Sequence, residues 1–223
     1  MLRRTILAGV IALAFATTPQ LSVAQTMSEF PLHHAAQAND AAAISRLLAT
    51  GNDIEARNEK GETALLVATH ANNVEAAEAL ISAAADVNAK DGIEDSPYLY
   101  AGARGHLEIL RLTLAHGADL KSINRYGGTA LIPAAERGHV ETVRTLIEAG
   151  IDVDHINRLG WTALLEAVIL GDGGERHQQI VDLLIEAGAN VDLADFDGVT
   201  PLQHARNRGF REIASALLAA GAK

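Results

Sequence analysis

The sequence predicts an all-α solenoid, in which six helix-turn-helix units stack on one another and are joined by finger-like turns. Three observations predict this fold: a repeat with a period of 33 residues, helix start and stop signals at fixed places in each repeat, and a composition poor in aromatic residues. Of the 223 residues, 48% are apolar and 4% are aromatic. These values favour short helices in close contact over a β-sandwich, and they exclude a disordered chain.

The repeat is clearest in a residue pair, usually Pro-Leu or Ala-Leu, at the start of the first helix of each unit. The pairs begin at residues 31, 64, 97, 130 and 163, and the last begins 38 residues later, at residue 201. The fifth unit therefore carries 38 − 33 = 5 extra residues, which we place in an exposed loop within residues 172–177. The six repeats then cover residues 25–57, 58–90, 91–123, 124–156, 157–194 and 195–223.

Each unit carries signals for two short helices. A hydroxyl group precedes the first helix, where it can accept a hydrogen bond from the free N–H groups of the first turn. These capping residues are Thr63, Ser96, Thr129, Thr162 and Thr200. Asparagine or glycine ends the first helix and glycine ends the second, since both residues tolerate the left-handed conformation. The predicted stops are Asn72, Gly105, Gly138, Gly171 and Gly209 for the first helices, and Gly51, Gly117, Gly150, Gly188 and Gly221 for the second.

Three positions depart from this pattern. Phe30 stands where repeat 1 should have its capping hydroxyl, as is common in the terminal unit of a stack. Ala84 replaces the second-helix glycine of repeat 2, at a cost of about 1 kcal/mol if the left-handed turn is kept. Glu94 replaces the glycine of the finger turn in repeat 3, so we expect that finger to bend differently.

The repeated string resembles the ankyrin repeat, whose pattern runs Thr-Pro-Leu-His-x-Ala-Ala, then Gly-His, Leu-Leu and Gly-Ala-Asp-Val-Asn. Residues 129–139 follow it closely, and the resemblance covers nearly all of residues 25–223. Direct matches are Thr200-Pro201-Leu202, Gly105-His106, Gly138-His139 and Gly117-Ala118-Asp119. The resemblance implies a concave face, made by the finger tips and the first helices, that binds other proteins.

The first 24 residues are typical of an export signal. Arg3 and Arg4 supply the positive charge, and residues 6–16 form an uncharged, mostly apolar run that is shorter than the roughly 20 residues needed to span a bilayer. A small-x-Ala cleavage site ends at Ala24, so we expect the mature chain to begin at Gln25. A cut within the run, or an apolar helix that belongs to the fold, are the alternatives.

The export signal predicts the address of the mature protein. Together with the resemblance to exported bacterial ankyrin repeat proteins, it indicates the periplasm of a Gram-negative bacterium, with secretion to the medium as the alternative. Loss of the two arginines leaves 16 basic and 28 acidic residues, a net charge of −12. We expect a monomer without membrane contact, and so acidic a chain is a poor partner for nucleic acid.

Chemical sites are weak in this sequence. Without cysteine there is no disulfide, no Cys-ligated metal and no thiol nucleophile. Asp172, Glu175 and His177 share the repeat-5 loop and could hold a metal, but two glycines separate them. Residues 86–92 fail the spacing of a calcium-binding loop. The six repeats also fill the whole chain after residue 24, since 4 × 33 + 38 + 29 = 199 residues. We therefore expect no catalytic domain, no catalytic residue, no metal and no cofactor.

The candidate binding residues lie next to the finger turns and near the ends of the first helices in repeats 4 to 6. In repeats 2 and 3 the corresponding positions are largely charged, whereas here they are arginine, aromatic and aliphatic, the usual material of binding hot spots. The candidates are Arg125, Tyr126, Arg137, Arg158, Leu159, Trp161, Ile169, Leu170, Phe196, Val199 and Arg208. The alternative is that Trp161, Ile169 and Leu170 simply pack under the enlarged loop.

The function predicted from these features is a non-catalytic scaffold that binds a periplasmic or secreted protein of unknown identity, stabilising or inhibiting an enzyme there. A secreted effector that binds host proteins predicts the same fold in another place. A metal-dependent hydrolase built on the repeat-5 loop is the third and weakest hypothesis.

Overall fold

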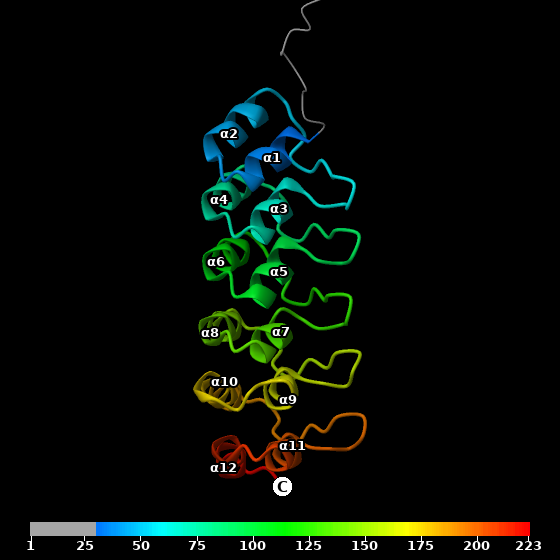
Figure 1. Cartoon of the computed structure of the whole chain (residues 1–223), viewed down its shortest axis with the longest axis vertical. Helices are drawn as coiled ribbons and strands as arrows, with labels where there is room; N and C mark the ends of the chain where they lie inside the picture. Colours follow the sequence, from blue (N-terminus) through cyan, green and yellow to red (C-terminus); the bar gives the residue numbers. More distant parts are fainter. Residues whose placement is uncertain (1–29) are drawn as a thin grey trace, which may run out of the picture.

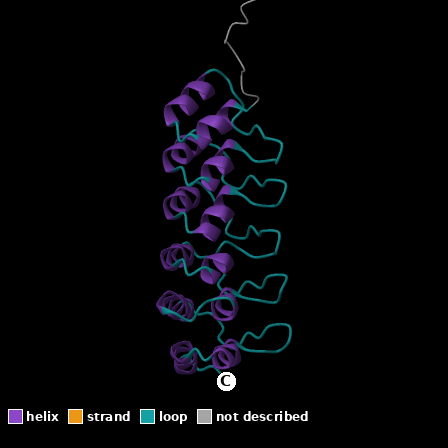
Figure 2. Ribbon diagram, in the orientation of Figure 1, coloured by secondary structure: helices purple, strands orange, loops and turns teal. Residues whose placement is uncertain are grey.

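The computed structural model describes residues 30–223 of the chain as a single elongated stack of helix pairs (Figure 1). The predicted export signal and the mature N-terminus at Gln25 lie outside the described residues. Within residues 30–223 there are twelve α-helices and no strand (Figure 2), which confirms the all-α solenoid of six repeats. No helix in this part of the chain has the length and apolar character needed to cross a bilayer.

The helices form two layers, with the finger turns projecting beside the layer of first helices (Figure 1). The first helices are α1 (Pro31–Gln37), α3 (Ala64–His70), α5 (Pro97–Arg104), α7 (Leu131–Glu136), α9 (Ala163–Ile169) and α11 (Pro201–Arg208). The second helices are α2 (Ala41–Ala49), α4 (Val74–Ser82), α6 (Leu107–Ala115), α8 (Val140–Glu148), α10 (Glu175–Glu186) and α12 (Arg211–Ala219). Each helix packs mainly on its own partner and on its counterpart in the next unit.

One continuous apolar core runs through the stack. The second residue of the repeated pair is fully buried in repeats 2 to 6, as in Leu65, Tyr98 and Leu131. Buried alanines such as Ala134 and Ala135 lie between helices and allow their close approach. No single unit could bury this surface alone, so stacking provides most of the stability.

Two rows of hydrogen bonds link successive units. In the first row, a side chain at the start of a second helix donates to a carbonyl at the end of the preceding unit's first helix. These pairs are Asn73 with Ala36 (2.8 Å), His106 with Thr69 (2.9 Å) and His177 with Glu136 (2.9 Å). In the second row, a basic side chain ahead of a first helix donates to a carbonyl in a neighbouring finger. Examples are Arg57 with Lys90, Lys90 with Ile123 (2.7 Å) and Arg158 with Arg125.

Four of the five predicted capping hydroxyls begin a helix as expected. Each accepts a hydrogen bond from the backbone N–H three residues further on, which satisfies one of the free donors of the first turn. They are Thr63, Ser96, Thr162 and Thr200. Thr200 also forms a reciprocal capping box with Gln203.

Thr129 does not cap, and that prediction is wrong. In repeat 2 the N–H of Val67 donates to the Thr63 carbonyl at 3.0 Å, but repeat 4 has Pro133 at the equivalent place and lacks the donor. Helix α7 therefore begins one residue later, at Leu131, and is six residues long. The Thr129 hydroxyl is left buried without a hydrogen-bond partner.

The helix stops are confirmed at every predicted position except Gly171. The others adopt positive φ angles, whereas in repeat 5 it is Gly173 that does so, with φ +71°. The reason is the insertion. Residues 175–177 form an additional first turn of α10, which has twelve residues where α8 has nine, so the turn moves toward the new helix start. The expected exposed loop is thus partly helical, and its His177 is buried.

The finger of repeat 3 does not bend differently, contrary to the expectation. Glu94 adopts φ +66°, close to the +75° of Gly127 in the next finger, and its N–H bonds to the Asp91 carbonyl in the same way. Ala84 likewise keeps the left-handed turn, with φ +69°. Both residues thus keep the left-handed conformation against their local preference.

Candidate functional site

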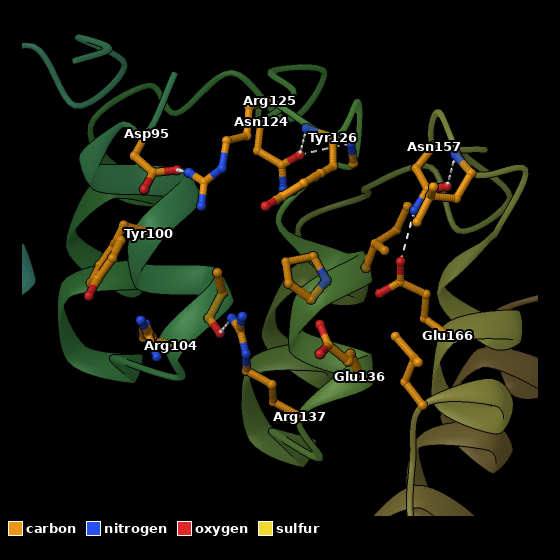
Figure 3. A pocket seen from close by; sticks show the side chains of 16 residues that line it. Asp95, Tyr100, Arg104, Asn124, Arg125, Tyr126, Glu136, Arg137, Asn157 and Glu166 are labelled. Atoms are coloured by element: carbon orange, nitrogen blue, oxygen red, sulfur yellow. Dashed lines mark hydrogen bonds and ion pairs between the residues drawn. The ribbon is translucent and has the colours of Figure 1, made fainter. Parts of the chain in front are cut away.

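A pocket of about 240 Å³ opens on the face made by the first helices and the fingers, across repeats 3 to 5 (Figure 3). Helices α5, α7 and α9 and the fingers that precede them supply its walls. Its lining consists of Asp95, Tyr100, Ala103, Arg104, Asn124, Arg125, Tyr126, Gly128, Ile132, Pro133, Glu136, Arg137, Asn157, Leu159, Glu166 and Leu170. We call it the central pocket.

The central pocket is hollow because repeat 4 has small residues where other repeats have large ones. Gly128 occupies the position in repeat 4 that Asp95 occupies in repeat 3 and Trp161 in repeat 5. Because it is glycine, it brings no side chain to the middle of the face. A Cβ atom at this position would meet its nearest neighbours at 3.6 Å, which is ordinary contact. The backbone there does not require glycine, so a larger residue would fill the space.

The cationic groups around the pocket already have partners. Arg125 forms an ion pair with Asp95 at 3.4 Å and lies over the ring of Tyr126, with 4.9 Å from its guanidinium carbon to the ring centroid. The Arg137 guanidinium donates to the carbonyl of Ala103 at 2.6 Å. Figure 3 shows these arginines along the side of the pocket formed by α5 and α7.

Two carboxylates of the pocket, Glu136 on α7 and Glu166 on α9, are less well compensated. Glu166, on α9, is only 6% exposed, and its Oε1 accepts a hydrogen bond from the amide of Asn157 at 2.8 Å. Burial, reinforced by the nearby carboxylate of Glu136, raises the pKa of Glu166 to about 7. Neither glutamate has an ion pair with any residue in the described part of the chain.

Five of the predicted binding residues line the central pocket. They are Arg125, Tyr126, Arg137, Leu159 and Leu170. The apolar members are well exposed, with 56% for Tyr126, 51% for Leu159 and 49% for Leu170. A rigid pocket rimmed by exposed aromatic and aliphatic side chains is suited to a protruding group of a partner.

The other six predicted residues lie outside the pocket lining. Arg158 and Arg208 are tied to carbonyls of neighbouring units, at Arg125 and at Ile169 and Gly171. Phe196 is exposed and its ring lies over Gly160 in the preceding finger. Trp161, Ile169 and Val199 are half-buried.

Eleven of the sixteen lining residues were not among the predicted ones, and four of these are charged or aromatic residues of the first helices: Tyr100, Arg104, Glu136 and Glu166. Glu166 had a visible signal, because it is the only charged residue within the otherwise apolar helix Ala163–Ile169. The other three sit in the first helices at positions that the pattern assigns to no particular role, and only the stacking brings them together.

The proposed metal ligands of the repeat-5 loop are engaged with other groups. The Nδ1 atom of His177 lies 2.7 Å from a carboxylate oxygen of Asp172, and its Nε2 atom donates to the Glu136 carbonyl. Glu175 begins α10 and is exposed. Across residues 30–223 no group of three or more histidine and acidic side chains is arranged to hold a metal ion.

Sequence comparison places the chain among known repeat proteins. The family described as "Ankyrin repeats (3 copies)" matches residues 12–91, 98–195 and 153–223. The putative ankyrin repeat protein YahD of Escherichia coli K12 is 58% identical over 57 residues, which is 26% of this chain and 28% of that protein. The match therefore spans less than a third of that relative's length.

Structural comparison agrees over most of the chain. An ankyrin repeat domain from Acinetobacter baumannii AYE is 69% identical, with a TM-score of 0.86, and the alignment covers 87% of this chain and all of that one. The ankyrin repeat protein EF0377 is 43% identical, with a TM-score of 0.81, covering 84% and 96% of the two chains. The ankyrin repeat domain of Bcl-3, a member of the IκB protein family, is 27% identical, with a TM-score of 0.79 and 88% of each chain covered.

Proposed function

The chain belongs to the ankyrin repeat family, and from that premise we propose that it is an exported scaffold that docks a protein partner on the face containing the central pocket. Ankyrin repeats indicate a protein–protein interaction scaffold, and such domains are in general non-catalytic. The partner is an exported protein, and the complex stabilises or inhibits it.

The observation that carries the proposal is the central pocket with its exposed rim. Tyr126, Leu159 and Leu170 present apolar surface beside a concavity, on a stack whose units are fixed by hydrogen bonds to their neighbours. Binding to a rigid surface costs little conformational entropy, so exposed groups of this kind contribute directly to affinity.

The test is capture of the partner from periplasmic extract by the purified protein, compared with two variants. Tyr126→Ala removes an exposed ring from the pocket rim and should weaken capture by about thirtyfold, since hot-spot truncation typically costs about 2 kcal/mol. Leu218→Ala is the matched control, because Leu218 is 48% exposed on the outer helix α12, away from the pocket. An equal loss of partner capture in both variants, or no loss of capture in Tyr126→Ala, contradicts the proposed surface.

Export is tested separately by sequencing the N-terminus of the protein recovered from cell fractions. We expect a periplasmic protein that begins at Gln25. Recovery from the culture medium instead would favour the secreted effector, and a chain that retains residues 1–24 would contradict cleavage after Ala24.

A further inference from the structure

We propose that the central pocket receives a basic side chain, lysine or arginine, of the protein partner, with Glu136 and Glu166 as its counter-charges. The inference rests on the proposed function and specifies the chemistry that the partner brings to the same face. The partner's basic residue would project from its surface into the space that Gly128 leaves open.

Glu166 differs from the other shielded carboxylates of the finger face because it has no basic partner. Glu62 is paired with His70 at 3.2 Å, and Asp195 with His204 at 2.7 Å. Asp95 is paired with Arg125. Glu166 has only the neutral amide of Asn157, and its second oxygen, Oε2, accepts no hydrogen bond from any group in residues 30–223. A carboxylate buried in this way gains most from a cation that arrives from outside.

The local charge around Glu166 is also suited to a cation. Glu136 extends from α7 into the same pocket and acts on Glu166 more strongly than Arg137 does. The rim arginines are committed to Asp95, to aromatic rings and to the Ala103 carbonyl. A bound ammonium or guanidinium group would lie between two carboxylates whose mutual repulsion it relieves.

The rest of the pocket is suited to the stem of such a side chain. The methylene groups of lysine and arginine pack well on apolar surface while the charged end reaches a polar partner. Pro133, Leu159 and Leu170 offer that surface, and the volume of about 240 Å³ admits one long side chain.

The experiment titrates the protein with four blocked amino acids and follows backbone amide shifts by NMR. The probes are the Nα-acetyl methylamides of arginine, lysine, norleucine and glutamate. We expect the arginine or the lysine probe to saturate at millimolar concentration, with shifts confined to residues 95–104, 124–137 and 157–170. Norleucine, which has the stem without the charge, should bind at least about tenfold more weakly. Equal binding of norleucine, or preferential binding of the glutamate probe, overturns the proposal.

Three variants and one control locate the effect. Glu166→Gln and Glu136→Gln should each weaken the basic probe by about tenfold or more, while Glu148→Gln, an exposed glutamate on α8, should leave it unchanged. Gly128→Val fills the pocket without touching a carboxylate, and the chain itself carries valine at the equivalent Val199, so the fold should tolerate it. Loss of binding in Gly128→Val with an unchanged melting curve supports the pocket, and retained binding overturns it.

The two proposals fail in different ways. If Tyr126→Ala weakens partner capture but Glu136→Gln and Glu166→Gln do not, the docking face stands and the basic anchor is wrong. If none of the three variants weakens capture, the docking face itself is wrong.

Discussion

Replacing Glu166 by glutamine tests the electrostatics of the central pocket through the stability of the fold. The substitution removes an ionisable group and keeps an oxygen that can accept the hydrogen bond from Asn157. Burial and the Glu136 carboxylate raise the pKa of Glu166 from 4.5 to about 7 in the folded chain. In the unfolded chain the carboxyl returns to its ordinary value.

The sign of the pH dependence follows from this difference. Between pH 4.5 and about 7 the folded chain retains a proton on Glu166 that the unfolded chain has lost. The stabilisation of the fold that comes from protonated Glu166 is therefore fully present below pH 4.5 and is lost as the pH rises through about 7. At about 1.4 kcal/mol per pKa unit, the loss is roughly 3 kcal/mol. Glutamine does not titrate. The free energy of unfolding of Glu166→Gln should therefore rise by about this much, relative to that of the natural chain, between pH 4.5 and 8.5.

The assay is urea unfolding of both proteins at pH 4.5, 7 and 8.5, with Glu148→Gln as an exposed control. Only the difference between variant and natural chain is interpreted, because other groups titrate in both. In thermal melts, the same effect would be about 2–4 °C per kcal/mol for a chain of this size. If the two unfolding free energies change in parallel with pH, Glu166 has an ordinary pKa and its role in the pocket is refuted.

Three further predictions concern single residues. Ala84→Gly should stabilise the fold by about 1 kcal/mol in urea unfolding, because Ala84 is held at φ +69°, and a loss of stability would show that its methyl group makes a needed contact. Thr129→Val should leave the free energy of unfolding unchanged or raise it, since the buried Thr129 hydroxyl has no partner. Thr162→Val should lower it by about 1 kcal/mol, because it removes a hydroxyl that caps α9. Equal effects in the two variants would contradict this prediction. Trp161→Ala should weaken partner capture, as we expect for Tyr126→Ala. Because Trp161 is half-buried, the melting curve of this variant is measured as well. Normal binding by the folded fraction would assign Trp161 to packing alone.

The architecture could be predicted from the sequence because it depends on local signals repeated at a fixed period. Capping hydroxyls, helix-ending glycines and paired apolar positions each specify a short element, and six copies leave little doubt about their stacking. Thr129 shows the limit of such reasoning. Its hydroxyl makes no capping bond, and α7 begins one residue later than the signal predicts, where Pro133 has no N–H to donate to the Thr129 carbonyl.

The site could be predicted only in part. Exposed residues near the finger turns, such as Tyr126 and Leu159, carry a sequence signal because they are large and apolar at positions that face outward. The pocket itself depends on what is missing at Gly128 and on the approach of Glu136 and Glu166 from different repeats. Neither the hollow nor the closeness of the two carboxylates belongs to one repeat, so the pattern of a single repeat does not reveal them.

The two rows of hydrogen bonds between units have a mechanical consequence. One row lies before the first helices begin and the other where they end, so the rows are separated by a helix length of about 10 Å. Bending the stack in the plane of both rows would stretch one row while compressing the other, and such motion is resisted where these hydrogen bonds are present. We therefore expect the mouth of a pocket that spans three units to keep nearly the same width when a protein docks on it. In that case a docking protein, and not this chain, changes shape where the two surfaces do not match.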